Sequence, residues 1–268
     1  MSNDKIKVAV TGAGGRMGKE VVKMVLEDEA LQLVAAIDPS AGPVDAGTII
    51  GAGETGVTIS ANLAEALNTV KADVLVDFTV PQAAYSNTRT AIEYGVRPVI
   101  GTTGFTPEQI TELDELCQKQ GIGALIAPNF SIGAILMMKF AAEAAKYMPH
   151  VEIIEYHGDQ KLDAPSGTSI KTAELISETR QELRQGNPKE EETIEGARGG
   201  YYNGFRIHSV RLPGVFAQQE VIFGGHGQTL KIRHDSYERA GYMPGVNHAV
   251  KKVMTYSGLI YGFEHIMD

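Results

Sequence analysis

A short segment in the middle of the chain concentrates residues that suit acid–base chemistry on a small anion. Residues 155–168 read Glu-Tyr-His-Gly-Asp-Gln-Lys-Leu-Asp-Ala-Pro-Ser-Gly-Thr. Histidine titrates near neutral pH, so His157 suits a general acid, and Lys161 adds a cation four residues later. Gly167 and Thr168 are expected to begin a helix, where backbone N–H groups can bind a carboxylate. The segment therefore indicates a site for a small dianionic substrate.

The same residues also have ordinary structural interpretations. A lone histidine is more often structural than catalytic, and a lone lysine is usually a solvated surface charge. Ser166 or Asp163 could simply cap the helix. The combination of His157 and Lys161 with this turn favours a functional site. No metal site is expected, because the seven histidines show no close pair and His157 has no second ligand at zinc-like spacing.

A glycine-rich loop near the N-terminus indicates a dinucleotide site. It follows a predicted strand and opens a predicted helix. Gly12 permits a tight turn, Gly14 and Gly15 let the backbone approach a pyrophosphate, and Gly18 lets the helix pack close to the strand. The spacing G-x-x-G-x-x-G departs from the commoner G-x-G-x-x-G, and a glycine-rich turn can be purely structural. Its position between strand and helix favours cofactor binding.

The residues at the end of the second predicted strand bear on the choice of cofactor. Asp38 lies where an acidic residue meets the hydroxyls of the adenine ribose. A carboxylate repels the extra phosphate of NADPH, and Pro39 adds no cation, so the sequence favours NADH. Arg16 in the glycine-rich loop leaves NADPH use open.

Two further loops follow predicted strands, at the edge where ligands bind in parallel sheets. Gly101-Thr-Thr-Gly-Phe105 offers small hydroxyl side chains to a nicotinamide ribose or carboxamide, and Asn129 in Ala127-Pro-Asn-Phe-Ser131 could hydrogen-bond the carboxamide. The alternative is ordinary loop chemistry, in which Thr106 and Ser131 cap helices. By spacing alone, both interpretations are equally supported.

The first half of the chain alternates short apolar runs with helical periods, which predicts a Rossmann-like, doubly wound parallel sheet. The expected strands are Ile6–Thr11, Leu31–Ile37, Val74–Asp77, Pro98–Ile100 and Ala124–Ala127, and the expected helices are Met17–Leu26, Ala61–Leu67, Ala83–Tyr94 and Pro107–Gln120. Thr106, Pro107 and Gln109 form a strong helix-start signal with a capping box.

The second half predicts an α+β domain with a mixed or antiparallel sheet, so the fold class is α/β with two domains. Helices are expected at about Ser131–Tyr147 and Ser166–Arg184, strands at Val151–His157, Phe205–Leu212, Glu220–Phe223 and Gln228–His234, and a C-terminal helical pattern at Gly241–Met254. The polar stretch Gln185–Gly200 is expected to be a loop.

Composition and charge exclude several classes of protein. The chain has 268 residues, 43% hydrophobic and 21% charged, and a formal net charge of −9, without the Lys and Arg clusters that bind nucleic acid. The apolar run Ile132–Met138 is too short to span a membrane. Met1–Lys5 leads directly into a strand, so no signal peptide is expected, and the single Cys117 cannot form an internal disulfide. These features predict a cytoplasmic protein with a small-molecule substrate.

Taken together, the motifs resemble the 4-hydroxy-tetrahydrodipicolinate reductase family, also called dihydrodipicolinate reductase, of the diaminopimelate route to lysine. The resemblance extends over nearly the whole chain. It is carried by Gly-Ala-Gly-Gly-Arg-Met-Gly18, Asp77-Phe-Thr79, Gly101-Thr-Thr-Gly-Phe105, Asn129-Phe-Ser131, Lys161-Leu-Asp-Ala-Pro-Ser-Gly-Thr168 and Arg206-Ile-His-Ser-Val-Arg211. The Lys161–Thr168 string is the most specific of these motifs.

The resemblance implies reduction of 4-hydroxy-tetrahydrodipicolinate to tetrahydrodipicolinate, with NADH or NADPH and loss of water, in a homotetramer. It implies a dinucleotide-binding domain at 1–129, completed by 237–268, and a substrate-binding and oligomerisation domain at 130–236. The residues implied to surround the cofactor are Gly12, Ala13, Gly14, Gly15, Arg16, Met17 and Asp38, with Gly101, Thr102, Thr103, Ala127, Pro128, Asn129 and Phe130 around the nicotinamide.

In the second domain, the resemblance implies that His157 is a proton donor or acceptor and that Lys161 is a proton donor beside the substrate. Gly167 and Thr168 would bind a substrate carboxylate through their N–H groups. The family has a second histidine, which contacts substrate, where this chain has Gly158. Loss of one hydrogen bond to a charged group would weaken substrate binding by about 1.5–3 kcal/mol, unless Gln160, His208 or water replaces it.

Two other functions fit parts of the sequence. Another amino-acid-pathway dehydrogenase, acting on aspartate or homoserine, could share the glycine-rich loop, but it would not be expected to carry the Lys161–Thr168 string. A non-catalytic NADH-binding sensor is favoured only by Gly158. The sequence leaves the ratio of NADH to NADPH use open, and does not decide whether His157 or Lys161 delivers the proton.

Overall fold

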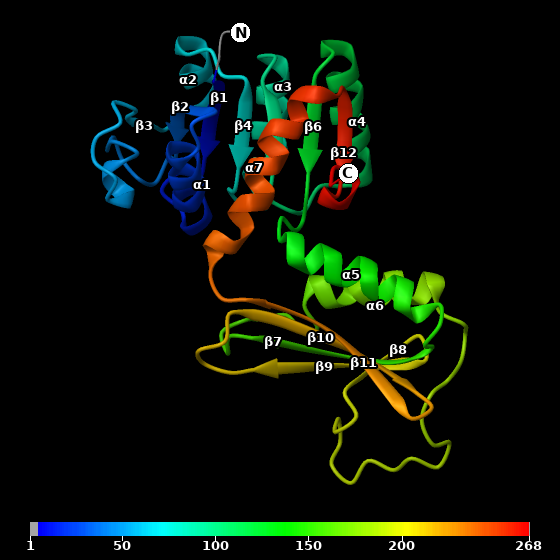
Figure 1. Cartoon of the computed structure of the whole chain (residues 1–268). Helices are drawn as coiled ribbons and strands as arrows, with labels where there is room; N and C mark the ends of the chain where they lie inside the picture. The colour runs from blue at the N-terminus through cyan, green and yellow to red at the C-terminus, as the bar shows by residue number, and fades with distance from the viewer. Residues whose placement is uncertain (1–4, 268) are drawn as a thin grey trace. The chain divides into compact units, whose positions relative to one another are not determined.

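The computed structural model describes residues 5–267 and divides the chain into two compact units (Figure 1). Unit 1 is Met1–Ser131 with Tyr242–Asp268, and unit 2 is Ile132–Gly241. Residues 1–4, on which the expectation of no signal peptide rests, and residue 268 lie outside the described part. The assignment of cofactor binding to the first unit and of substrate binding and oligomerisation to the second stays a prediction.

Unit 1 is built on a parallel sheet. Within residues 5–267 its seven strands lie in the order β12-β6-β5-β4-β1-β2-β3, and each neighbouring pair is parallel. The strands are β1 (Ile6–Thr11), β2 (Leu31–Ile37), β3 (Ile59–Ser60), β4 (Val74–Asp77), β5 (Arg97–Ile100), β6 (Gly123–Ile126) and β12 (Gly258–Tyr261). The predicted doubly wound sheet is confirmed.

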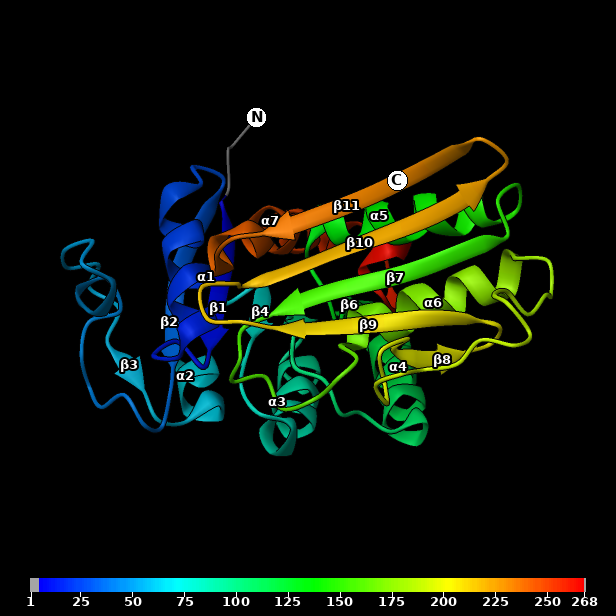
Figure 2. The same ribbon diagram turned by 90° about the horizontal axis from the view of Figure 1, so that it is seen from below.

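Helices cover both faces of this sheet. Figures 1 and 2 show α1 and α7 on one face and α2, α3 and α4 on the other. The helices are α1 (Arg16–Glu27), α2 (Leu63–Thr69), α3 (Pro81–Glu93), α4 (Pro107–Gln120) and α7 (Met243–Lys252), with short 3-10 turns at Thr48–Ile50, Val253–Thr255 and Phe263–His265. Because both faces are covered, the strand residues are mostly apolar and buried: all four residues of β4 and of β6 are buried, and Asp77 of β4 is the one charged residue among these eight.

The predicted capping box at the start of α4 is confirmed by both of its hydrogen bonds. The Thr106 side chain accepts a hydrogen bond from the Gln109 N–H, and the Gln109 side chain accepts one from the Thr106 N–H. Pro107 occupies the first turn of α4, and Gly121 ends the helix in the left-handed conformation with φ of 65°. The expected start of α4 at Pro107 follows from this capping box.

Unit 2 contains a mixed sheet with two helices packed on one face (Figure 2). The five strands in the described residues lie in the order β11-β10-β7-β9-β8, and β7 and β9 are parallel while the other neighbours are antiparallel. The elements are α5 (Ile132–Ala145), β7 (His150–His157), α6 (Gly167–Thr179), β8 (Gly200–Tyr202), β9 (Phe205–Arg211), β10 (Ala217–Gly225) and β11 (Gln228–Ser236), followed by a 3-10 turn at Arg239–Tyr242. The predicted mixed sheet is confirmed.

The predicted helix Ser166–Arg184 is wrong at its C-terminal end. α6 stops at Thr179, because Arg180 takes up extended backbone angles and its side chain is buried against nearby carbonyl groups. The short strands β3, β8 and β12 were not predicted. Runs of two to four residues are too short to show a periodic pattern, and only pairing with a neighbour identifies them as strands.

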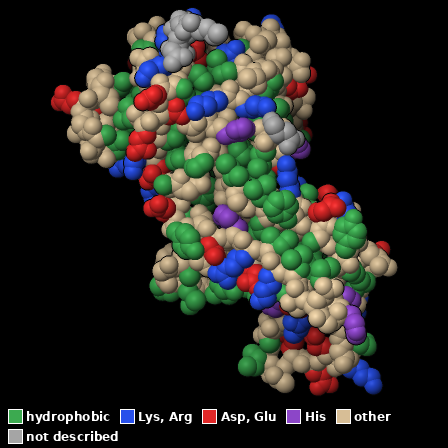
Figure 3. Space-filling model, viewed as in Figure 1, with side chains coloured by type: hydrophobic (Ala, Val, Ile, Leu, Met, Phe, Trp, Pro, Cys, Tyr) green, Lys and Arg blue, Asp and Glu red, His purple; other side chains and the backbone are tan. Residues whose placement is uncertain are grey.

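The distribution of charged side chains on the surface and the apolar content of the helices agree with the expectations drawn from the composition. On the face seen in Figure 3, Lys and Arg side chains are scattered among acidic ones. Between residues 5 and 267, none of the helices has both the length and the apolar content needed to cross a membrane.

Candidate functional site

The glycine-rich loop of unit 1 requires glycine for geometric reasons. Gly12 has φ of +72°, and a Cβ there would lie 2.8 Å from the Phe78 carbonyl oxygen. A Cβ on Gly18 would lie only 1.9 Å from the Gly12 carbonyl oxygen, so the first turn of α1 packs directly on the loop. The Gly12 N–H donates to the Ile37 carbonyl at 2.8 Å, which holds the loop against the end of β2. The loop therefore has the close backbone approach that a dinucleotide site needs.

Asp38, at the end of β2, lies against this loop. Its carboxylate accepts hydrogen bonds from the Gly14 N–H at 3.0 Å, and from the Ser40 N–H at 2.9 Å and Oγ at 2.6 Å. Burial alone would raise the pKa of Asp38, but these hydrogen bonds outweigh it and hold the pKa below its ordinary value. Asp38 is thus a charged acceptor beside the glycine-rich loop. Ser40 was missed, although a serine two residues after an aspartate is a common signal for such a turn.

A second buried carboxylate, Asp77 at the end of β4, connects the end of β1, the loop after β4, helix α3 and the loop after β5. Its oxygens accept hydrogen bonds from Thr11 Oγ1 at 2.8 Å, from the Thr79 N–H at 2.9 Å, from Asn87 Nδ2 at 2.8 Å and from Thr102 Oγ1 at 3.0 Å. These bonds bring the predicted nicotinamide loop, through Thr102, next to the end of β1. The sequence motif contained Asp77, but its connecting role was not predicted, because its partners are far apart in the chain.

The other predicted cofactor residues differ in solvent exposure and are buried, partly buried or exposed. The side chains of Ala13, Ala127 and Phe130 are buried in the core, and Phe130 lies between the rings of Phe78 and Phe263, each centroid 5.7 Å away. Residues whose side chains are buried in this way could contact a cofactor only through their backbone atoms. Arg16, Thr103 and Pro128 are exposed, Gly15 is exposed, and Met17, Asn129 and Gly101 are partly buried.

Two local features restrict the conformation of the predicted nicotinamide loops, Gly101–Phe105 and Ala127–Ser131. A Cβ on Gly101 would lie 2.0 Å from the Phe78 ring, so only glycine fits. Asn129 Oδ1 accepts a hydrogen bond from the Ser131 N–H at 2.8 Å, so this side-chain oxygen supports its own loop. The structural alternative had named Thr106 and Ser131 as helix caps and gave no role to the Asn129 side chain, and the role of Asn129 towards a cofactor stays a prediction.

In unit 2, His157 ends β7 beside a fully buried carboxylate. The Nδ1 atom of His157 hydrogen-bonds Glu155 Oε2, and the Arg211 guanidinium contacts both oxygens of Glu155, at 3.0 and 2.8 Å. Arg211 Nη2 also donates to the Asp163 carbonyl at 2.8 Å. Glu155 and Arg211 were not predicted as site residues; the alternation along β7 placed Glu155 on the same face as His157, which is the signal that could have found it.

Lys161 lies in the loop that follows β7. Its ammonium group donates to Asp163 Oδ1 at 2.6 Å, and this contact lowers the pKa of Asp163. The Lys161 N–H donates to the Gly158 carbonyl at 3.1 Å, which closes the turn between His157 and Lys161. The structure thus keeps the predicted acid and the predicted cation on one short turn.

The start of α6 is fixed to the sheet by a buried hydrogen-bond network. Ser166 caps the helix by accepting from the Ser169 N–H, so the capping interpretation of Ser166 is confirmed. Ser169 Oγ donates to Gln219 Oε1 at 2.7 Å, and Gln219 Nε2 donates to Thr172 Oγ1 at 2.8 Å. A Cβ on Gly167 would meet no described atom within 4 Å, which leaves room beside the first helical turn. A capped helix start held rigidly by β10 is compatible with carboxylate binding at Gly167 and Thr168.

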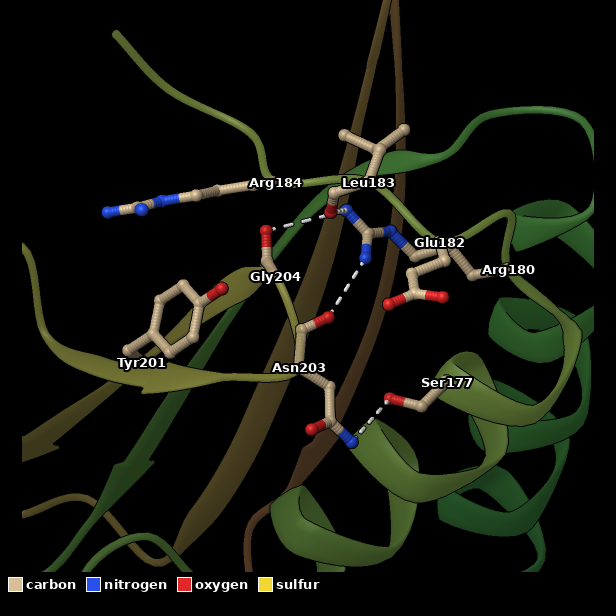
Figure 4. Close-up of a pocket in the computed structure, with 8 residues that line it drawn as sticks. All are labelled: Ser177, Arg180, Glu182, Leu183, Arg184, Tyr201, Asn203 and Gly204. Carbon is tan, nitrogen blue, oxygen red and sulfur yellow. Dashed lines mark hydrogen bonds between the residues drawn. The ribbon is translucent and has the colours of Figure 1, made fainter. Parts of the chain in front are cut away.

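A polar pocket of about 470 Å³ lies elsewhere in unit 2, and none of its lining residues is a predicted site residue (Figure 4). Arg180 is one of the residues that line this pocket. The guanidinium donates to the carbonyls of Asn203 at 3.1 Å and Leu183 at 3.0 Å, and lies 5.2 Å from the centre of the Phe205 ring. Arg180 therefore ties the segment after α6 to the turn before β9, which is a structural role.

Among the residues between 5 and 267, no three His, Cys, Asp or Glu side chains are grouped so that they could hold a metal ion.

Comparison with known proteins connects these features to one family. The family model for the N-terminal part of dihydrodipicolinate reductase matches residues 6–130, and the model for its C-terminal part matches residues 133–267. Both segments that carry the candidate site residues lie inside these matches.

Individual relatives extend over the full length of the chain. The 4-hydroxy-tetrahydrodipicolinate reductase of Listeria innocua is 56% identical, over 98% of this chain and 100% of its own, and that of Geobacillus kaustophilus is 53% identical, over 98% and 99%. A dipicolinate-bound dihydrodipicolinate reductase from Paenisporosarcina sp. TG-14 has a TM-score of 0.89 at 47% identity, covering 98% of this chain and 100% of its own. An amine dehydrogenase from Mycobacterium smegmatis shares the fold alone, with a TM-score of 0.69 at 17% identity, over 97% of this chain and 95% of its own.

Proposed function

Because the chain belongs to the dihydrodipicolinate reductase family, we propose that it reduces 4-hydroxy-tetrahydrodipicolinate to tetrahydrodipicolinate, with NADH as the preferred reductant and with loss of water. This reaction belongs to lysine and diaminopimelate biosynthesis. The observation that carries the residue assignment is the short turn in which His157, Lys161 and the capped start of α6 follow one another.

Unit 1 has the features needed to hold the dinucleotide. At Gly12 and Gly18 a Cβ would collide with backbone atoms, so glycine at these positions lets a ligand approach the loop backbone and the start of α1 closely. Gly12 to Met17 would hold the pyrophosphate, and Gly101 to Thr103 with Ala127 to Phe130 would surround the nicotinamide. The reduced nicotinamide, when bound, supplies the hydride.

The preference for NADH rests on Asp38. Its hydrogen-bond donors are the uncharged Gly14 and Ser40, so no hydrogen-bonded cation offsets its negative charge. A carboxylate of this kind accepts hydrogen bonds from ribose hydroxyls and repels a 2′-phosphate. Arg16 is exposed in the glycine-rich loop and is the residue we expect to support the slower use of NADPH.

The residues of unit 2 bind the dicarboxylate and move the proton. Gly167 and Thr168 would orient one substrate carboxylate at the start of α6, and Lys161 would offset the negative charge of the ring dianion. For this, the Lys161 ammonium must turn from Asp163 towards the substrate. His157 or Lys161 then delivers the proton to the reduced ring.

Gly158 predicts weakened substrate binding relative to family members that have a second histidine there. We expect Gly158→His to lower the Michaelis constant for the dicarboxylate by roughly 10- to 100-fold, because one hydrogen bond to a charged group contributes about 1.5–3 kcal/mol. Gly158→Ala is the matched control, since its Cβ meets the Val215 carbonyl oxygen at the same 3.3 Å but adds no imidazole. Steady-state kinetics would measure both. An unchanged Michaelis constant in Gly158→His would mean that another group already replaces the missing histidine.

A coupled assay tests the function as a whole. Freshly prepared 4-hydroxy-tetrahydrodipicolinate is supplied, and oxidation of NADH and of NADPH is followed separately by absorbance. We expect turnover with both cofactors and a higher kcat/KM with NADH. Turnover with aspartate semialdehyde in place of the cyclic substrate would favour an aspartate- or homoserine-pathway dehydrogenase. Binding of NADH without turnover of any dicarboxylate would favour a sensor.

We further propose that the protein acts in the cytoplasm as a homotetramer. A biosynthetic reductase that consumes NADH needs the cytoplasmic cofactor pool, and Cys117 is a buried free thiol, as in reducing compartments. Analytical ultracentrifugation would test the tetramer: a sedimenting mass of a monomer or dimer at micromolar concentration would exclude it.

A further inference from the structure

One end of the helix-facing side of the unit 2 sheet is polar, and this is the end that carries His157. The strand register places Ser209, Glu155 and Gln219 side by side on β9, β7 and β10, and it places Arg211, His157 and Ala217 in the next row. Further along β7 the same face carries buried Val151 and Ile153. A carboxylate on such a face costs free energy unless it is fully hydrogen-bonded.

Glu155 meets this condition and remains charged. Arg211 contacts both carboxylate oxygens, Ser209 adds a hydrogen bond, and His157 Nδ1 contacts Oε2. Burial alone would raise the pKa of Glu155, but the hydrogen bonds from His157, Arg211 and Ser209 lower it to about 2. The carboxylate therefore accepts hydrogen bonds and donates none at neutral pH.

This acceptor decides which nitrogen of His157 carries the proton. Because ionised Glu155 can only accept, Nδ1 of neutral His157 must be the protonated nitrogen, and Nε2 is left to exchange a proton with the substrate. We propose that Glu155 is a positioning residue that fixes this tautomer and ring orientation of His157. The proposal rests on the proposed role of His157 in proton transfer.

Arg211 extends the same arrangement to the loop that carries Lys161. It donates to the Asp163 carbonyl at 2.8 Å while it holds Glu155. Lys161 in turn pairs with the Asp163 side chain. One buried carboxylate thus orients His157 directly and, through Arg211, holds the loop of the neighbouring cation in place.

The charges around His157 set the expected pH dependence. β7 contributes Glu155 and β9 contributes Arg211, while β10 contributes the uncharged Ala217 and Gln219 in the facing rows. The α6 residues hydrogen-bonded to Gln219 are the uncharged Ser169 and Thr172, and the loop after β7 adds the Lys161–Asp163 pair. Glu155→Gln removes the negative charge that contacts the imidazole, so we expect the pH profile of activity to change.

A matched control lies on the opposite face of the same strand. Glu152 Oε2 contacts His208 Nε2 at 2.7 Å, and Glu152 Oε1 accepts from Arg198 at 2.6 Å. Glu152→Gln therefore removes a carboxylate with a histidine and an arginine partner, but away from the His157 turn. Any effect specific to the proposed site should appear in Glu155→Gln and be absent from Glu152→Gln.

The direct test reads the tautomer and needs no substrate. The full chain is labelled with ¹⁵N-histidine, the His157 signals are identified by their loss in His157→Gln, and imidazole ¹⁵N shifts are recorded at alkaline pH. We expect the Nδ1–H tautomer in the wild type and in Glu152→Gln, and a substantial Nε2–H population in Glu155→Gln. A wild-type His157 in the Nε2–H form would overturn the proposal, even if Glu155→Gln fails to fold. So would an unchanged tautomer in a folded Glu155→Gln.

Kinetics supply a second readout. We expect kcat of Glu155→Gln to fall on the order of 100-fold, its pH profile to differ from that of the wild type and the substrate KM to change little, because the loss concerns proton transfer. Glu155→Asp should restore part of the rate, since it keeps the charge. A wild-type pH profile in Glu155→Gln would contradict the proposal. If His157→Ala keeps full activity, the assigned role of His157 fails, and the tautomer experiment still decides the positioning by Glu155.

Discussion

Replacing Lys161 by alanine is expected to lower kcat/KM for 4-hydroxy-tetrahydrodipicolinate on the order of 1000-fold, while NADH affinity stays unchanged. In the proposed function, the ammonium group would offset the charge of the ring dianion and is one of the two candidate proton donors. In the structure Lys161 pairs with Asp163 on one short turn with His157. Steady-state kinetics with saturating NADH, and a separate NADH titration by fluorescence, would measure the two quantities.

The control for this experiment is Lys171→Ala. Lys171 lies on α6 in the same unit and forms a surface ion pair with Glu174 at 3.6 Å. Surface pairs contribute about 0–1 kcal/mol, so neither variant should unfold. A Lys161→Ala protein with activity within a few-fold of Lys171→Ala would remove Lys161 from the proposed site.

Replacing Gly12 by alanine is expected to weaken NADH binding by more than 10-fold and to lower the free energy of unfolding by about 1–3 kcal/mol. Two causes add. The residue has φ of +72°, and its new Cβ would lie 2.8 Å from the Phe78 carbonyl oxygen. Relief of this contact would displace the glycine-rich loop that we propose holds the pyrophosphate. Calorimetric NADH titration and denaturant unfolding would measure the two effects.

Gly95→Ala separates the two causes. Gly95 has nearly the same φ, +71°, but a Cβ there would meet no described atom within 4 Å. Its variant should show the backbone strain alone, with unchanged NADH affinity. Equal NADH affinities in the Gly12 and Gly95 variants would contradict the assignment of the loop to cofactor binding.

Features that depend on neighbouring residues were predictable from the sequence. The capping box of α4 involves residues three apart, and β1, β2 and β4 are short, mostly apolar runs between helical periods. Local chemistry also identified His157, Lys161 and Asp38 as candidates, since each stands at the end of a strand or in the turn that follows one.

Partners that are distant in the chain could not be predicted in the same way. Glu155 meets Arg211 across 56 positions, and Asp77 meets Thr11 across 66. No local pattern specifies such a pair, because it arises when strands from different parts of the chain become neighbours. The same reason explains why α6 ends before the predicted residue. The Arg180 guanidinium donates a hydrogen bond to the carbonyl of Asn203, which lies 23 positions later in the chain.

Hydride reduction of a cyclic dicarboxylate is tested most directly by isotope transfer from the cofactor to the product. The protein is incubated with 4-hydroxy-tetrahydrodipicolinate and NADH that carries deuterium at one or the other C4 position, in separate reactions, and the product is examined by mass spectrometry. We predict that tetrahydrodipicolinate forms and acquires deuterium from one of the two labelled cofactors. Unlabelled product in both reactions, or oxidation of NADH without tetrahydrodipicolinate, would contradict the proposed function.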